Sequence, residues 1–126
     1  MGRAHVLVLT QDQVLIESLR KEFPTKENDK IGMDVAPNTF EAGLLAGVLH
    51  PDCVVIDFSI GTIEAFHLCK CLKGNAVFTQ TILCALTPED GTIRGLDVNE
   101  TFQKPFDPHL LAERLRTLVG VKKELT

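Results

Sequence analysis

The chain has 126 residues, 44% of them hydrophobic, and a formal net charge of −4. This length and composition indicate one domain with a real core, and the acidic balance argues against a surface that neutralises nucleic-acid phosphates. Because the sequence contains neither a charged-then-apolar leader nor an apolar run of about 18 residues, it predicts no signal peptide and no membrane span, and we expect a cytoplasmic protein.

The N-terminal part predicts a strand followed by a helix. Residues 5–10 are continuously apolar and rich in β-branched side chains, which is typical of a buried strand. Asp12 stands where a helix N-cap would, ahead of an apolar stripe that reaches Phe23. Pro24 cannot continue a helix, so we expect the helix to end there.

A second strand and helix follow a polar loop. The strand is predicted over 31–36, and Asn38 or Thr39 can cap a helix that runs through Leu49. This helix carries several small residues, which suit close packing on a sheet; they are Ala42, Gly43, Ala46 and Gly47. We therefore expect the small residues to face the sheet.

The middle of the chain repeats the alternation. The apolar run 53–57 predicts a third strand, and a third helix is expected from Thr62 or Ile63 through Leu72, where Gly74 and Asn75 stop it. Residues 79–86 predict the fourth strand.

The C-terminal part begins irregularly. Residues 88–95 contain one proline and two glycines, which leaves room for little more than a turn or two of helix. A poor fifth strand is predicted near 100–103. Asp107 and Pro108 then open a helix with leucines at helical spacing, and Gly120 is expected to end it.

This alternation of strands and helices predicts a doubly wound α/β fold. Short apolar strands joined by helical crossovers form a parallel sheet with helices on both faces, here with five strands in the order 2-1-3-4-5. We expect residues 1–121 to form the domain and 122–126 to be a tail or the start of a linker.

Three polar residues stand at the ends of separate apolar runs. Asp57 closes the third strand, Thr87 follows the fourth, and Lys104 follows the fifth. Because ligands bind at the carboxyl ends of parallel strands, a carboxylate, a hydroxyl and an ammonium are expected to converge there. Such a trio can take a phosphoryl group, with the carboxylate as acceptor and the other two as its partners.

The same residues carry a resemblance to a known family. Residues 51–59 resemble the third strand and phosphoacceptor loop of the receiver domains of response regulators, which are similar to chemotaxis regulators. The pair 86–87 and the run 104–106 resemble two further signatures of that family. Residues 33–42 resemble its second strand running into the second helix, and 66–73 resemble its third helix. The resemblance implies a flavodoxin-like receiver fold in which Asp57 is the phosphoacceptor and Thr87 and Lys104 contact the phosphoryl group.

The sequence also departs from the family pattern. Thr10 and Gln11 stand where receivers carry the acidic pair that holds magnesium with the acceptor, so Asp57 is expected to bind this hard cation only weakly. Asp12 is a conceivable substitute ligand, although a helix cap is the favoured interpretation. Thr101 occupies the position of the aromatic switch residue. These departures predict a degenerate member of the family.

Pro88 is a further departure. It follows Thr87 and has no N–H to offer a phosphoryl oxygen, whereas receivers usually carry a small residue with a backbone donor there.

Two functions remain open at this point. The first is a receiver domain in two-component or phosphorelay signal transduction, with a sensor histidine kinase or another signalling protein as partner. The alternative is a pseudo-receiver that works as a phosphorylation-independent interaction module, reaching an output domain or a second copy through a face within 88–118. Neither function involves nucleic acid or membrane contact by this domain.

An enzyme is not expected. The loop 10–13 lacks the glycine and hydroxyl density that cradles phosphates, no G-x-G-x-x-G occurs, and neither Ser18 nor Ser59 lies in a G-x-S-x-G context. No zinc spacing occurs among the four cysteines, which we expect to be reduced thiols in the core or near the surface. The histidines His5, His50, His67 and His109 are interpreted as packing or solvated residues.

Overall fold

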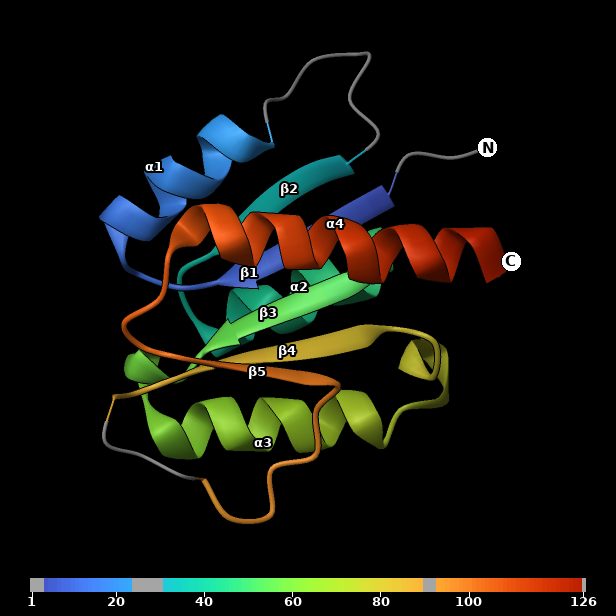
Figure 1. Cartoon of the computed structure of the whole chain (residues 1–126). Helices are drawn as coiled ribbons and strands as arrows, with labels where there is room; N and C mark the ends of the chain where they lie inside the picture. Colours follow the sequence, from blue (N-terminus) through green and yellow to red (C-terminus); the bar gives the residue numbers. More distant parts are fainter. Residues whose placement is uncertain (1–3, 24–30, 90–92, 126) are drawn as a thin grey trace.

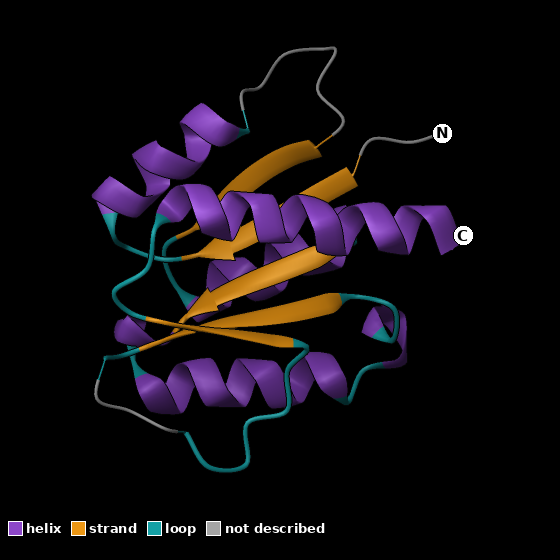
Figure 2. Cartoon of the chain, in the orientation of Figure 1, coloured by secondary structure: helices purple, strands orange, loops and turns teal. Residues whose placement is uncertain are grey.

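The computed structural model of the chain describes residues 4–23, 31–89 and 93–125. Strands and helices alternate along it, and its strands form one parallel sheet (Figure 2). The sheet order is β2-β1-β3-β4-β5, which confirms the predicted topology. The strands are β1 (Ala4–Leu9), β2 (Ile31–Ala36), β3 (Cys53–Asp57), β4 (Ile82–Thr87) and β5 (Glu100–Gln103).

Helices cover both faces of this sheet (Figure 1). On one face lie α1 (Gln13–Glu22) and α4 (Pro108–Leu125), which contact each other. On the other face lie α2 (Thr39–Leu49) and α3 (Thr62–Lys73). Two short 3-10 helices, η1 (Phe58–Ile60) and η2 (Ala76–Phe78), follow β3 and precede β4. No helix in the described part of the chain is long and apolar enough to cross a membrane.

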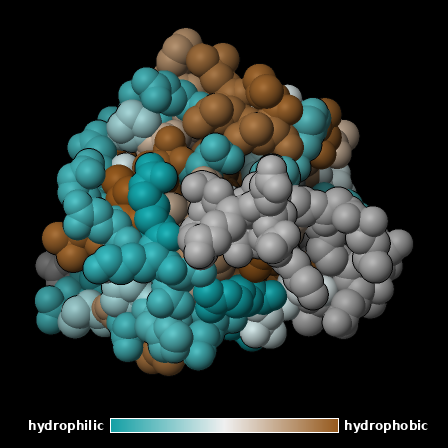
Figure 3. All heavy atoms as spheres, turned by 90° about the horizontal axis from the view of Figure 1, so that it is seen from above, coloured by the Kyte–Doolittle hydropathy of each residue, from teal (hydrophilic) through white to brown (hydrophobic). Residues whose placement is uncertain are grey.

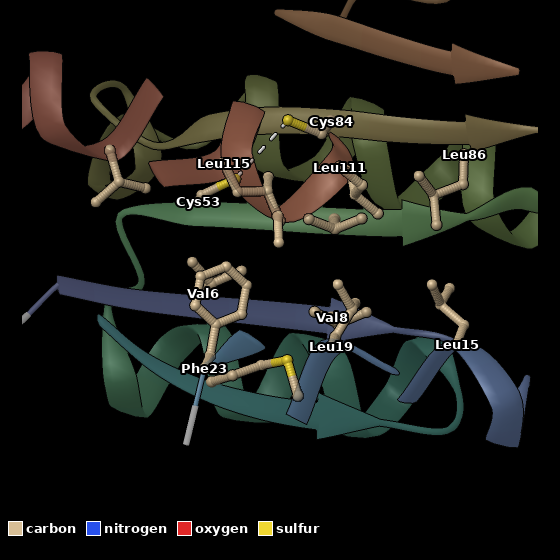
Figure 4. Packing of buried hydrophobic residues seen from close by; sticks show 14 of the residues in the cluster. Val6, Val8, Leu15, Leu19, Phe23, Cys53, Cys84, Leu86, Leu111 and Leu115 are labelled. Carbon is tan, nitrogen blue, oxygen red and sulfur yellow. Dashed lines mark hydrogen bonds between the residues drawn. The ribbon is translucent and has the colours of Figure 1, made fainter. Parts of the chain in front are cut away.

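Each face of the sheet has its own apolar core. Because both faces are covered, every residue of β3 is buried, as expected of a central parallel strand. Figure 4 shows the core on the α1 and α4 side, where side chains from β1, β3 and β4 meet those of the two helices. Labelled members are Val6, Val8, Leu15, Leu19, Phe23, Cys53, Cys84, Leu86, Leu111 and Leu115.

The cysteines are free thiols, as expected from the sequence. The sulfur atoms of Cys53 and Cys84 lie 3.8 Å apart in the core between β3 and β4. Cys69 is buried and Cys71 is exposed, because a separation of two residues places side chains on different faces of a helix. Burial raises the pKa of the Cys69 thiol to about 11.

Both predicted helix caps are confirmed. The Asp12 carboxylate accepts hydrogen bonds from the backbone N–H groups of Val14 and Leu15, at 3.0 and 3.2 Å. The Asn38 side chain accepts one from Glu41 at 2.8 Å. Each satisfies N–H groups that have no partner within the helix itself.

Several element boundaries differ from the sequence prediction. The first strand is Ala4–Leu9 and leaves Thr10 just beyond its end. β4 begins at Ile82 rather than at residue 79, because Thr79 still has helical backbone angles as the C-cap of η2. Helix α1 ends at Glu22, and Pro24 lies outside the described residues.

The expected end of the last helix at Gly120 is wrong. α4 continues through Leu125. Gly120 lies within the helix in open space, where a helix accommodates glycine at a cost of about 1 kcal/mol relative to alanine.

The segment between β4 and β5 contains turns and, within its described residues, no helix. The predicted turn or two of helix is therefore not found there, and residues 90–92 lie outside the described part. Ile93, Leu96 and Val98 instead pack as partly buried side chains against the α2 and α3 core. Asn99 fixes the end of the segment to β4, because its side chain accepts from the Leu83 N–H and its own N–H donates to the Leu83 carbonyl, both at 2.8 Å.

The small residues of α2 divide between its two faces. Ala42 and Ala46 are buried against the sheet, as predicted. Gly43 and Gly47 are exposed, and a Cβ at either position would meet no atom within 4 Å. The prediction that the glycines pack on the sheet is therefore wrong.

Candidate functional site

A buried carboxylate lies at the carboxyl edge of the sheet, where three separate segments meet. Asp57 is the last residue of β3, Thr10 follows β1, and Lys104 follows β5. The central position of β3 between β1 and β4 brings these residues together. The Asp57 side chain is 0% exposed.

Each oxygen of the Asp57 carboxylate has its own partners. Oδ2 accepts from the Thr10 hydroxyl at 2.7 Å and from the Lys104 ammonium at 3.2 Å. Oδ1 lies 3.0 Å from the Lys104 Nζ and accepts from the Ser59 backbone N–H and hydroxyl at 3.0 and 2.8 Å. Donors on three sides and a cation therefore replace the water that burial removes.

These partners decide the charge of Asp57. Burial raises its pKa, but the hydrogen bonds from Thr10, Ser59 and Lys104 together outweigh burial and lower the pKa below its ordinary value of 3.8. The group is therefore a carboxylate at neutral pH. Lys104, with 27% of its side chain exposed, is its counter-ion.

Ser59 is a site residue that the sequence analysis missed. It follows Asp57 by two positions, within η1, and both its backbone N–H and its hydroxyl donate to the Asp57 carboxylate. Its hydroxyl also accepts from the Lys104 ammonium at 3.3 Å. The spacing Asp-x-Ser is the available signal, because an aspartate side chain commonly accepts from the backbone N–H two residues on.

Thr87 joins the site through the backbone. It is 3% exposed at the end of β4, one position beyond Leu86, which is paired with Asp57 in the register. Its carbonyl accepts from the Lys104 N–H at 2.9 Å, and the Lys104–Pro105 peptide bond is cis. The three sequence-predicted residues Asp57, Thr87 and Lys104 therefore do lie at one edge of the sheet.

Gln11 and Asp12 form hydrogen bonds with groups other than the Asp57 carboxylate. The Gln11 side chain donates to the carbonyl of Pro37 at 2.8 Å, which draws it toward the end of β2. Asp12 caps α1 with one carboxylate oxygen, while its backbone N–H donates to the Thr10 hydroxyl at 3.1 Å. A metal-binding role for Asp12 stays a prediction.

The two positions directly after β1 add no carboxylate to that of Asp57. Magnesium takes near-octahedral oxygen ligands that usually include one or two carboxylates besides its other ligands. Here the positions after β1 supply the hydroxyl of Thr10 and the amide of Gln11, and the hydroxyl already donates to Asp57. Within the described ranges, no group of three or more His, Cys, Asp or Glu side chains can hold a metal ion.

A pocket of about 410 Å³ opens beside Lys104. It lies between the start of α1, the segment after β4 and the connection from β5 to α4. Its charged groups are two carboxylates and one ammonium, set among apolar side chains. The lining residues are Asp12, Val14, Leu15, Glu89, Lys104, Pro105, Phe106 and Pro108.

Thr101 lies in β5 opposite Ala85 and is exposed. The neighbouring aromatic residue, Phe102, points to the other face of the sheet, where it is half-buried against the α1 and α4 core. Since side chains alternate along a strand, Phe102 cannot take the place of an aromatic at position 101 without a register shift.

Comparisons with known proteins identify the fold. Neither the models of protein families nor the curated proteins match the sequence. Solved structures do match it: a two-component response regulator from Legionella pneumophila has a TM-score of 0.76 and 21% identity over 94% of this chain and 99% of its own. The receiver domain of a signal transduction histidine kinase from Syntrophus aciditrophicus has a TM-score of 0.76 and 17% identity, covering 93% of this chain and 90% of its own.

The chemotaxis protein CheY4 of Vibrio cholerae is similar in the same way, with a TM-score of 0.75 and 15% identity over 93% of this chain and 99% of its own. The chain therefore has the flavodoxin-like fold of response-regulator receiver domains, as its resemblance to that family predicted. At these identities the likeness establishes the fold.

Proposed function

We propose that the chain is a receiver-type module of two-component signalling that acts by protein recognition, with Asp57 in the phosphoacceptor position but kept as an unmodified carboxylate. It has no enzymatic activity of its own. Its partner is a sensor histidine kinase or another signalling protein, and the 88–118 face is the surface through which an output domain is reached.

One observation carries this proposal: the Asp57 carboxylate already has a full set of partners. Its oxygens accept from Thr10, Ser59 and Lys104 at 2.7 to 3.2 Å. Phosphoryl transfer would require one oxygen to leave these donors and attack phosphorus. The interactions stabilise the starting carboxylate, so they raise the barrier unless they are stronger still in the transition state.

The residues available to magnesium support the same proposal. Transfer to an aspartate places several negative oxygens beside a carboxylate, and a cation is the usual means of stabilising that charge. Thr10 and Gln11 supply no carboxylate to hold one. Pro88, directly after Thr87, also has no N–H to donate to a phosphoryl oxygen.

A second function is favoured by a specific observation. Asp57, Thr87 and Lys104 lie at one sheet edge, and Lys104 contacts Asp57 directly. This arrangement supports phosphoryl acceptance by Asp57 in a receiver domain whose magnesium site is degraded.

One experiment separates the two functions. The protein is incubated with acetyl phosphate and millimolar magnesium chloride, and its intact mass is measured beside that of Asp57→Asn. We expect no addition of a phosphoryl group to either protein. Stoichiometric addition to the wild type that is absent from Asp57→Asn would identify a working phosphoacceptor and overturn the proposal.

A further inference from the structure

Helix α2 exposes a continuous apolar stripe. Phe40, Leu44 and Val48 are 74, 57 and 76% exposed, and their spacing of four residues aligns them along one side of the helix. Figure 3 shows a hydrophobic region along the upper border of the molecule, on the side where Figure 1 places α2 behind the sheet. The helix is apolar on its buried side as well, through Ala42 and Ala46. A helix that is hydrophobic all round is normally covered on all sides.

Two glycines lie in the row beside this stripe. Gly43 and Gly47 are exposed within the helix, and a Cβ at either position would meet nothing within 4 Å. The fold of the single chain therefore gives no reason for glycine there, although glycine is among the poorest helix-forming residues. Without side chains at these two positions, the helix backbone beside the apolar ridge of Phe40, Leu44 and Val48 is open to close approach by another helix.

We infer that this face, made of Phe40, Gly43, Leu44, Gly47 and Val48, is the contact surface for a second copy of the chain. Helices pack by fitting the ridge of one into the groove of the other, and here one face presents both a ridge and a row of glycines at the same spacing. A surface of that kind is self-complementary, which is what a symmetric dimer requires.

Charge favours the same occupant. None of the five residues of the face is charged and only Glu41 of α2 borders it with a charge, whereas the chain as a whole carries a net charge of −4. Two copies with the same charge repel each other least when they meet through uncharged surfaces. A partner recognised through opposite charge would call for charged residues within the face.

The exposed area sets the expected affinity. A fully accessible phenylalanine presents on the order of 200 Å² and leucine and valine somewhat less, so the exposed fractions amount to about 300–400 Å² of apolar surface per copy. A stable standard interface removes about 800 Å² per partner from water. The dimer is therefore weak and depends on protein concentration.

This inference goes beyond the proposed function and does not depend on it, because α2 contributes no side chain to the hydrogen bonds of Asp57. The dimer is expected equally for Asp57→Asn. Whether or not Asp57 accepts a phosphoryl group, the dimer therefore has to be tested separately.

The test is sedimentation equilibrium of the whole chain from about 10 μM to about 1 mM, a range that covers weak association. We expect the average mass of the wild type to rise toward that of a dimer, and Leu44→Glu to remain monomeric. Leu110→Glu is the matched control, because it changes the same residue type at a nearly equal exposure of 59%, in the alternative 88–118 face. Circular dichroism checks that both variants are folded.

A second variant tests the close approach at the glycines. Gly47→Ala adds a methyl group in open space, so it is expected to stabilise the monomer to thermal unfolding while weakening association several-fold. A wild type that is monomeric throughout, or dimerisation by Leu44→Glu equal to that of the wild type, overturns the inference. If only Leu110→Glu fails to dimerise, the dimer contact lies in the 88–118 face and the inference is wrong. If Gly47→Ala associates as strongly as the wild type, the two helices do not approach closely at the glycines.

Discussion

Replacing Thr10 by valine tests the hydrogen-bonded state of Asp57 directly. Thr10 is completely buried, and valine has almost the same shape, so the change removes one hydroxyl without leaving a large cavity. The lost group donates to the Asp57 carboxylate at 2.7 Å and accepts from the Asp12 N–H at 3.1 Å. The second of these bonds lies near the surface, where water can replace it.

The bond to Asp57 sets the size of the effect. A hydrogen bond to a charged group contributes about 1.5–3 kcal/mol, and a buried carboxylate that loses a donor keeps its full desolvation cost. We expect Thr10→Val to lower the free energy of unfolding at pH 7 by about 2 kcal/mol. With a typical urea dependence for a small domain, the unfolding midpoint falls by about 1 M.

The pH dependence gives a second check. Because the folded-state pKa of Asp57 is lowered, its ionisation stabilises the protein above the ordinary value of 3.8, and this stabilisation is lost as the pH falls through the folded-state pKa. Thr10→Val moves the folded-state pKa back upward. The difference in the free energy of unfolding between the wild type and Thr10→Val is therefore largest at neutral pH and becomes smaller below about pH 4.

Urea unfolding followed by circular dichroism from pH 7 to pH 3 measures both effects. Thr79→Val is the control, since the Thr79 hydroxyl donates to the Ala76 carbonyl at 2.7 Å on the exposed surface. We expect this control to change stability by no more than about 0.5 kcal/mol. A similarly small loss in Thr10→Val at pH 7 would refute a charge-assisted bond between Thr10 and Asp57.

Three further predictions follow from the same geometry. Lys104→Ala is expected to raise the pKa of Asp57 and to cost about 2–3 kcal/mol of stability, because it leaves a buried carboxylate without its counter-ion. An unchanged carboxyl titration by NMR contradicts the pairing. The double variant Thr10→Asp, Gln11→Asp is expected to bind magnesium at least about tenfold more tightly than the wild type in calorimetry, and equal affinity would show that these positions do not limit metal binding. His109, whose pKa is raised first by its hydrogen bond to a glutamate of α1, stabilises the fold below its ordinary pKa of 6.5, and this contribution is lost as the pH rises through its folded-state value. The wild type should therefore lose more stability than His109→Gln between pH 6 and pH 9 in urea unfolding, and parallel curves would exclude the pairing.

The sheet and its order were predictable because buried parallel strands leave a simple pattern. The run that ends at Asp57 is apolar throughout, and strand ends of this kind meet at one edge. The caps Asp12 and Asn38 were predictable for a similar reason, since the side chain that satisfies a helix start is local in the sequence. The positions of Thr87 and Lys104 followed from the strands alone.

Other features depend on contacts that a pattern does not contain. Thr10 reaches the Asp57 carboxylate from the end of a different strand, 47 residues away in the sequence, so no local spacing indicates this contact. Beyond Thr39 and Glu41 in its first turn, helix α2 is apolar on every side, so hydrophobic periodicity could not indicate which of its residues face the sheet. Gly43 and Gly47 were assigned to the wrong face for that reason.

The partners of Asp57 also bear on how the chain folds. The bonds from Thr10 and from Lys104 each span 47 residues of sequence, so neither can form before distant strands have been brought together. We expect contacts between residues so far apart in the sequence to form late in folding, after the local helices and the first strand pairs. Changes at these residues should therefore act mainly on the rate of unfolding, with little effect on the rate of folding. We therefore expect the Asp57 cluster to form after the sheet, so that a change in its chemistry alters the stability of the fold and leaves the route of folding unchanged.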